Sequence, residues 1–132
     1  MTSHTATAIG PRGAAARIAY TALAVFLLVA IVLETVEHGT GYWQIAVFGL
    51  GPDVALLLGA GSGLAKGRLH PRAVRLYNLL HRFWGPLLLA VLASFGLISI
   101  GYLIGALAWA FHIALDRALG YGLRTRDGFQ RA

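Results

Sequence analysis

The stretch SIGYLIGALAWAFHIALDRAL, residues 99–119, decides the fold class. It is apolar over most of its length, and a helix of about 20 such residues is long enough to cross the hydrocarbon core of a bilayer. His112, Asp116 and Arg117 stand near its end, where lipid would make ionisable groups costly. The stretch therefore predicts a membrane-spanning helix that turns these groups toward other helices.

The composition agrees with a membrane protein. The chain has 132 residues, of which 58% are hydrophobic and 12% are charged, whereas roughly a quarter of the residues of a soluble domain are charged. It has no cysteine, which excludes disulfides and thiolate metal sites. The net charge of +6 comes from residues that flank apolar runs, so we expect no nucleic-acid partner.

Four apolar segments predict four transmembrane helices, at about residues 15–36, 42–58, 73–95 and 99–119. The apolar run TALAVFLLVAIVL, residues 21–33 of the first segment, is followed by Glu34 and Glu37 and by no small-residue cleavage site, so we interpret this segment as an uncleaved span. Pro86 should kink the third helix. The predicted fold is all-α, an antiparallel four-helix bundle at residues 15–123. A flexible cytoplasmic N-terminus, residues 1–14, precedes it, and a basic cytoplasmic tail, residues 124–132, follows.

The basic residues predict the orientation of the bundle. They occur before the first span, between the second and third spans, and after the fourth, whereas the other two connections have no Lys or Arg. The positive-inside rule then places both termini in the cytoplasm. The basic residues used here are Arg12, Arg17, Lys66, Arg68, Arg72, Arg75, Arg124, Arg126 and Arg131.

Ionisable residues of three spans share one depth in the cytoplasmic half. Counted from the cytoplasmic ends at 1.5 Å per residue, Asp53 and His81 lie roughly 10–12 Å deep. His112 and Asp116 lie within a similar layer, roughly 6–15 Å deep, and their i, i+4 spacing puts them on one helix face. Neutral imidazole and carboxylate are both good zinc ligands. These four residues are therefore the predicted ligands of a divalent, zinc-like metal ion.

Further polar residues lie around this predicted site. Tyr77 and Asn78 precede His81 by one turn or less, and Arg82 and Arg117 follow ligand positions directly. We predict that these four contribute outer contacts or a substrate pocket, with the arginines reaching the interface or pairing with a carboxylate. Gly101 and Gly105 form a small-xxx-small step that suits close helix packing inside the chain or a homo-oligomer interface.

The polar layer has alternative interpretations. It is a buried network that only holds helices together, a proton-handling or transport path, or a metal or catalytic site. A haem bound between His81 and His112 is a further alternative.

The same residues carry a resemblance to a known family. PD at Pro52–Asp53, YNLLH at Tyr77–His81 and HIALDRALGYGL at His112–Leu123 resemble the small bacterial integral membrane proteins called domain of unknown function 4260. The similarity spans about residues 15–130. It implies a four-span protein of the bacterial inner membrane and brings no established activity.

A fainter similarity is to membrane-bound metal-dependent hydrolases, whose pattern has an Asp after Pro, then a His-Arg pair, then His-x-x-x-Asp. Asp53, His81–Arg82 and His112/Asp116 match this pattern in order. The pattern's second acidic residue is Ala55 in this chain, and its Thr-His is replaced by Gly85–Pro86. These departures argue against hydrolase activity more than against common ancestry.

Two functions follow from the sequence. One is a membrane protein with a metal-binding, hydrolase-like pocket for a lipid or lipid-like substrate. The other is a non-enzymatic transporter-like or partner-binding subunit whose polar residues form a structural network. In both, the lipid bilayer is the expected partner.

Overall fold

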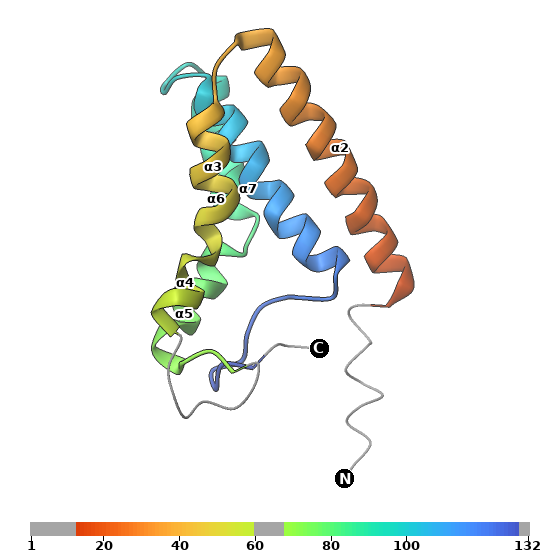
Figure 1. Ribbon diagram of the computed structural model, residues 1–132, viewed down its shortest axis with the longest axis vertical. Coiled ribbons are helices and arrows are strands. Elements are labelled where there is room, and N and C mark those ends of the chain that lie inside the picture. Colours follow the sequence, from red (N-terminus) through yellow and green to blue (C-terminus); the bar gives the residue numbers. More distant parts are fainter. Residues whose placement is uncertain (1–12, 60–67, 130–132) are drawn as a thin grey trace.

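The computed structural model describes residues 13–59 and 68–129, and these form helices without a β-strand, which confirms the all-α prediction. The helical segments run alternately up and down the molecule, and the start of the first lies at the same end as the close of the last (Figure 1). The predicted flexible N-terminus lies almost wholly outside the described residues. The helices are α2 (Ala14–His38), α3 (Tyr42–Leu50), the 3-10 turn η1 (Gly51–Asp53), α4 (Val54–Gly59), α5 (Pro71–Leu80), α6 (Trp84–Ser94) and α7 (Gly101–Ala118).

The helix α2 is apolar on all sides but buries only one stripe. Ala24, Leu27, Ile31 and Thr35 are its buried residues, and their spacing of three and four places them on the face toward α7. Large apolar side chains on its other faces are exposed, among them Phe26 at 67%. The helix ends at Gly39, whose φ of 61° suits the left-handed cap that bonds back to the Thr35 carbonyl.

The second segment differs from the single helix expected at residues 42–58. It is α3 and α4 joined by η1, in which Pro52 occupies one of the first two positions. Proline has no N–H to donate to the preceding turn, so the α-helical ladder is interrupted there and tightens into a 3-10 turn. The interruption places Asp53 at the junction of the two helices.

The third segment is also two helices, bent by 40° at a short break. The helix α5 ends at Leu80 with His81 as its cap, and α6 begins at Trp84. Pro86 lies in the first turn of α6, where a missing N–H is tolerated, so the kink predicted from this proline becomes a full break one turn earlier.

The helix α7 is the centre of the molecule, since α2, α3 and α6 all pack against it. The predicted close approach at Gly101 and Gly105 is confirmed. A Cβ built at Gly105 would lie 2.7 Å from a ring carbon of Phe48, and one at Gly101 would lie 2.6 Å from the amide nitrogen of Gln44. The small residues therefore seat α3 directly on α7.

Membrane-spanning potential differs among these helices. By length and composition α2 alone qualifies as a span, and α5 with α6 qualifies as a second if the bent pair counts as one. The 18-residue helix α7 is continuous, but His112, Asp116 and Arg117 interrupt its apolar sequence near its end. The helical bundle is thus established, whereas four transmembrane helices remain a prediction.

We expect Gly105→Ala to lower the free energy of unfolding by roughly 1–3 kcal/mol, because the new methyl group must displace Phe48 or separate α3 from α7. Thermal unfolding of the purified protein, followed by far-UV circular dichroism, measures the loss. Gly51→Ala is the matched control, since a Cβ there meets no atom within 4 Å. Equal effects of the two substitutions would contradict the close packing of α3 on α7.

Candidate metal site

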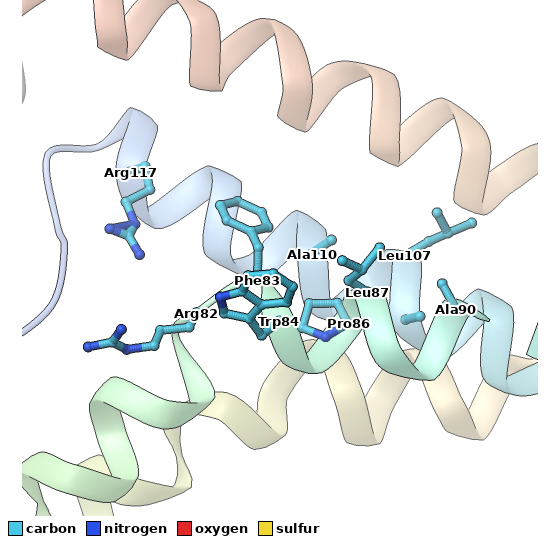
Figure 2. A pocket seen from close by; sticks show the side chains of 10 residues that line it. Arg82, Phe83, Trp84, Pro86, Leu87, Ala90, Leu107, Ala110 and Arg117 are labelled. Atoms are coloured by element: carbon cyan, nitrogen blue, oxygen red, sulfur yellow. The ribbon is translucent and has the colours of Figure 1, made fainter. Parts of the chain in front are cut away.

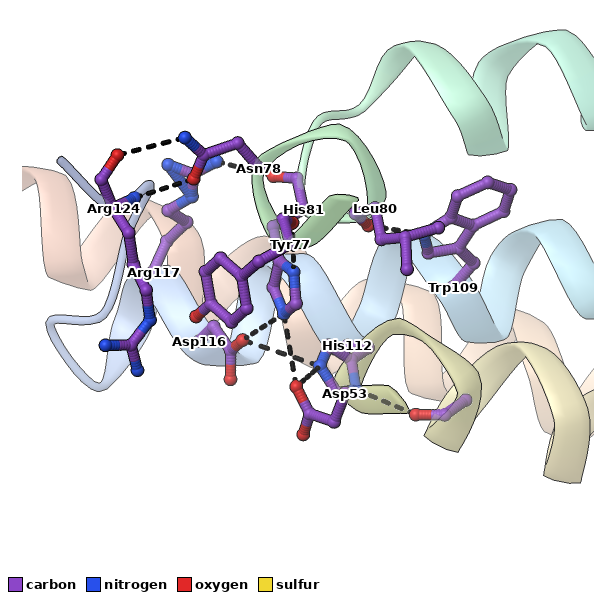
Figure 3. A network of polar contacts seen from close by, with 11 residues as sticks. Asp53, Tyr77, Asn78, Leu80, His81, Trp109, His112, Asp116, Arg117 and Arg124 are labelled. Atoms are coloured by element: carbon purple, nitrogen blue, oxygen red, sulfur yellow. Dashed lines mark hydrogen bonds and ion pairs between the residues drawn. The ribbon is translucent and has the colours of Figure 1, made fainter. Parts of the chain in front are cut away.

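The four predicted ligands come together from three separate segments (Figure 3). Asp53 closes the 3-10 turn η1, His81 caps α5, and His112 and Asp116 lie one turn apart on α7. One nitrogen or oxygen of each residue lies within 4.8 Å of the corresponding atom of every other. The residues sit at the two helix interruptions and on the central helix, so the breaks in the predicted spans are what bring them together.

The four distances between the imidazole nitrogens and the carboxylate oxygens are nearly uniform. His81 Nε2 lies 3.2 Å from an oxygen of Asp53 and 3.2 Å from an oxygen of Asp116. His112 Nε2 lies 3.1 Å and 3.4 Å from the same two oxygens. Zinc ligands at bond lengths of about 2.0–2.1 Å in a tetrahedron are separated by about 3.3 Å. The four imidazole-to-carboxylate distances thus already match the separation between neighbouring ligand atoms of one such ion.

Backbone carbonyls orient both imidazole rings. His81 Nδ1 lies 2.8 Å from the carbonyl oxygen of Tyr77, and His112 Nδ1 lies 2.7 Å from that of Gly49. A carbonyl oxygen only accepts, so each Nδ1 carries the proton and donates it. In the neutral ring Nε2 then holds a lone pair, and both lone pairs point toward the carboxylates. Metal-binding histidines commonly have this arrangement, in which the second ring nitrogen donates to a backbone carbonyl.

This geometry calls for positive charge at its centre. Two carboxylate oxygens and two imidazole lone pairs are all acceptors, and acceptors 3.1–3.4 Å apart repel unless protons or a cation lie between them. A divalent cation would neutralise the two carboxylates while both rings stay neutral. His81 is 2% exposed, whereas the Asp53 side chain is 44% exposed. The cluster can therefore hold a metal ion that is reached from the Asp53 side.

The break between α5 and α6 is stabilised by side chains of α7. The carbonyl oxygens of Leu80 and His81 accept hydrogen bonds from Trp109 Nε1 and from the Arg117 guanidinium, both at 2.7 Å. A backbone carbonyl that loses its helical partner must find another donor when it is buried. Trp109 is itself held by Phe48 on one side and by close contact with Gly85 on the other. The central helix thus keeps His81 at the position that faces the other ligands.

The residues predicted around the ligands occupy different positions. Tyr77 is buried and stacks on the His81 ring, with the two ring centres 4.0 Å apart. Asn78 binds the backbone of Arg124 through two hydrogen bonds, of 2.7 and 2.9 Å, and so points away from the ligands. Arg117 reaches the His81 carbonyl, and Arg82 lines a cavity on another side of the molecule.

Sequence reasoning missed two contributors to this site. The Gly49 carbonyl orients His112, but a backbone oxygen leaves no signature in the sequence. The sequence marks Arg124 only as a charge of the basic tail, yet its guanidinium lies over the Tyr77 ring, 4.8 Å from the ring centre. No spacing pattern links Arg124 to Tyr77, since the pair forms only when the chain after α7 folds back.

The arrangement leaves no room for the haem alternative. A porphyrin bound by both histidines would have to occupy the space between the two Nε2 atoms. Oxygens of Asp53 and Asp116 already lie within 3.4 Å of both atoms. The site therefore suits a single small cation.

The positions at which the chain departs from the hydrolase pattern are used for packing. Ala55 is fully buried in a cluster with Leu69, Ala73 and Tyr77. A Cβ at Gly85 would lie 2.3 Å from the Trp109 ring. Larger or polar residues at these two positions would disrupt the contacts that position Tyr77 and Trp109.

Fold and site together define, over the described residues, a helical bundle with a partly buried His₂Asp₂ cluster. Residues 17–132 match the family model described as domain of unknown function 4260, and the chain belongs to this family. No curated protein and no solved structure matches the chain. The family assignment confirms the resemblance seen in the sequence, and no relative supplies an activity.

We expect Trp109→Phe to lower the free energy of unfolding by about 1–3 kcal/mol, since the Leu80 carbonyl at the break would lose its donor. Trp84→Phe is the control, because Trp84 is 75% exposed. Thermal unfolding of both variants measures the difference. If Trp109→Phe were as mild as the control, the indole hydrogen bond would not be what stabilises the break.

Proposed function

We propose that this protein is a four-span integral membrane protein, with both termini in the cytoplasm, that binds one divalent transition-metal ion. The ion, zinc or one of similar preference, binds Asp53, His81, His112 and Asp116. Metal binding joins three segments of the bundle at a point where the helices themselves are interrupted.

Support for the membrane part comes from the outer surface of the bundle. Large apolar side chains are exposed along α2, α3 and α6, among them Val36 at 78%, Leu50 at 75% and Leu88 at 62%. A soluble monomer rarely exposes so much contiguous apolar surface, whereas lipid favours it. The carbonyls at the α5–α6 break are bonded within the protein, as hydrocarbon requires.

Support for the orientation comes from the charges at the two ends of the bundle. Arg17 near the start of α2 and the arginines of α5 lie at the end where α7 finishes (Figure 1). Glu34 and Glu37 lie at the other end of α2. Positive residues on one side favour that side as the cytoplasmic one.

One observation carries the metal part. Both Nε2 atoms face the same two carboxylate oxygens at 3.1–3.4 Å, while both Nδ1 atoms are engaged by backbone carbonyls. With both rings neutral, each Nε2 offers a lone pair to a cation that the two carboxylates also bind. Protonated rings would instead donate to the carboxylates as ion pairs, and that is the structural network from which metal analysis distinguishes the site.

The four side chains by themselves supply four ligands, which is the number typical of a structural zinc site. A catalytic site keeps a coordination position open for water. Asp53 is the exposed ligand, and it would have to move aside for such a position to open. The proposal is therefore metal binding, and hydrolysis is not part of it.

We expect the protein purified in detergent to contain about one zinc ion per chain, measured by elemental analysis after equilibration with trace zinc. His81→Ala and His112→Ala should each remove the ion, with a loss of affinity above the roughly 10–100-fold typical of an outer-shell change. His38→Ala is the matched control, because His38 pairs with Glu34 far from the cluster.

A wild-type protein that stays free of zinc, manganese and iron after reconstitution would contradict the metal site. The four residues would then be a structural network. Equal metal loss in His38→Ala and His112→Ala would instead point to unfolding, which circular dichroism of both variants detects.

The orientation is testable because the natural chain has no cysteine. We expect Glu37→Cys and Leu97→Cys to react with a membrane-impermeant thiol reagent in right-side-out vesicles. Asp127→Cys should react only in inverted vesicles. These three positions are exposed and lie outside the predicted spans. Labelling of all three from one side, or extraction of the protein by alkaline carbonate, would contradict the four-span topology.

A further inference from the structure

An apolar cavity of about 550 Å³ opens between α6 and α7, away from the candidate metal site. On α7 its lining residues and the metal ligands lie roughly 140° apart around the helix axis, at 100° per residue. Figure 2 shows its two arginines, Arg82 and Arg117, at one end and its apolar side chains along the rest. The apolar lining includes Trp84, Pro86, Leu87, Ala90, Leu107 and Ala110.

Arg82 also lines a second cavity, of about 700 Å³, which is basic. Arg75, Arg124 and Arg126 line this second cavity with it. Among the described residues that line either cavity there is no acidic side chain. The apolar groove and a cleft lined by four arginines thus share Arg82.

The Arg82 side chain is available for a ligand. It is exposed and has no hydrogen-bond or ion-pair partner in the part of the chain that the structure describes. Arg117 lies across the groove, held by its bond to the His81 carbonyl. Guanidinium groups bind phosphate through paired, charge-assisted hydrogen bonds, so two of them at the end of an apolar groove fit a phosphate ester.

The length of the groove suits an acyl chain. From Arg117 to Ala106 the helix α7 rises about 16 Å, which is about half the thickness of the hydrocarbon core. On the proposed topology the arginines lie at the cytoplasmic interface and the apolar part extends into one leaflet. A phospholipid in that leaflet would have the same direction and the same depth as the groove, with its headgroup at the arginines.

We propose that the α6–α7 groove and the adjoining basic cleft form a binding site for one anionic phospholipid of the cytoplasmic leaflet. Its acyl chain would lie along Trp84 and Leu87, and its phosphate between Arg82 and Arg117. The remaining arginines of the cleft favour a headgroup with net negative charge over a zwitterionic one. This inference rests on the membrane part of the proposed function and is independent of the metal.

Trp84 provides the measurement, because its indole lines the groove and is 75% exposed. The full chain is reconstituted into vesicles of phosphatidylcholine and phosphatidylglycerol in which one or the other carries brominated acyl chains. Bromine quenches tryptophan fluorescence on contact, and the Trp84→Phe variant isolates the signal of this residue. We expect phosphatidylglycerol to be preferred severalfold at Trp84.

The Arg82→Gln variant should lose roughly fivefold of that preference, the expected effect of one interfacial arginine. Arg72→Gln removes the same charge from an exposed position on α5 that lines neither cavity, and it should keep the preference. Equal quenching by both lipids in the wild type, or equal losses in the two variants, would overturn the lipid site.

Flotation of the same vesicles separates this outcome from a failure of the membrane proposal. Protein that does not float with the vesicles would overturn both proposals. Protein that floats while neither lipid quenches Trp84 would mean that another surface, such as a second copy of the chain, covers the groove. That result would overturn the lipid site and leave the membrane topology intact.

Discussion

Two imidazole Nε2 atoms, each 3.1–3.4 Å from the same two carboxylate oxygens, are the constraint on which the rest of this structure depends. Two carboxylate oxygens and two imidazole nitrogens repel one another, so they stay together only if the chain holds them and positive charge lies among them. The Nδ1 atom of each histidine is bound by a backbone carbonyl, that of Tyr77 in α5 for His81 and that of Gly49 in α3 for His112. The bundle is therefore organised around a cluster of ionisable side chains, which would be costly in a purely apolar core.

The helix interruptions follow from this constraint. In uninterrupted helices, Asp53 and His81 would lie within regular turns whose backbone groups are all hydrogen-bonded. The 3-10 turn and the α5–α6 break instead end a helix at each of these residues. The break frees carbonyls, and Trp109 and Arg117 of α7 bind them. The central helix α7 thus supplies two of the ligands. It also supplies the donors for the carbonyls that are freed where His81, a third ligand, ends α5.

The helix α7 also separates two chemically different surfaces. One face presents His112 and Asp116 to the ligand cluster, and another forms the apolar groove that ends at Arg82 and Arg117. His81 and Asp116 belong to the ligand cluster, whereas Arg82 and Arg117, the next residues in the chain, line the groove. A ligand residue and a groove residue are thus placed by the same turn of backbone, so the position of one depends on the position of the other.

The sequence by itself determined the helical class, the family and which four ionisable residues would lie together. Apolar run length, charge placement and i, i+4 spacing are local properties, and they were sufficient for these predictions. Only the tertiary structure decided that the second and third segments are broken, that Gly49 orients His112, and that Arg124 covers Tyr77. These contacts involve backbone oxygens and segments far apart in the chain, whose meeting depends on packing against α7 and not on any spacing in the sequence.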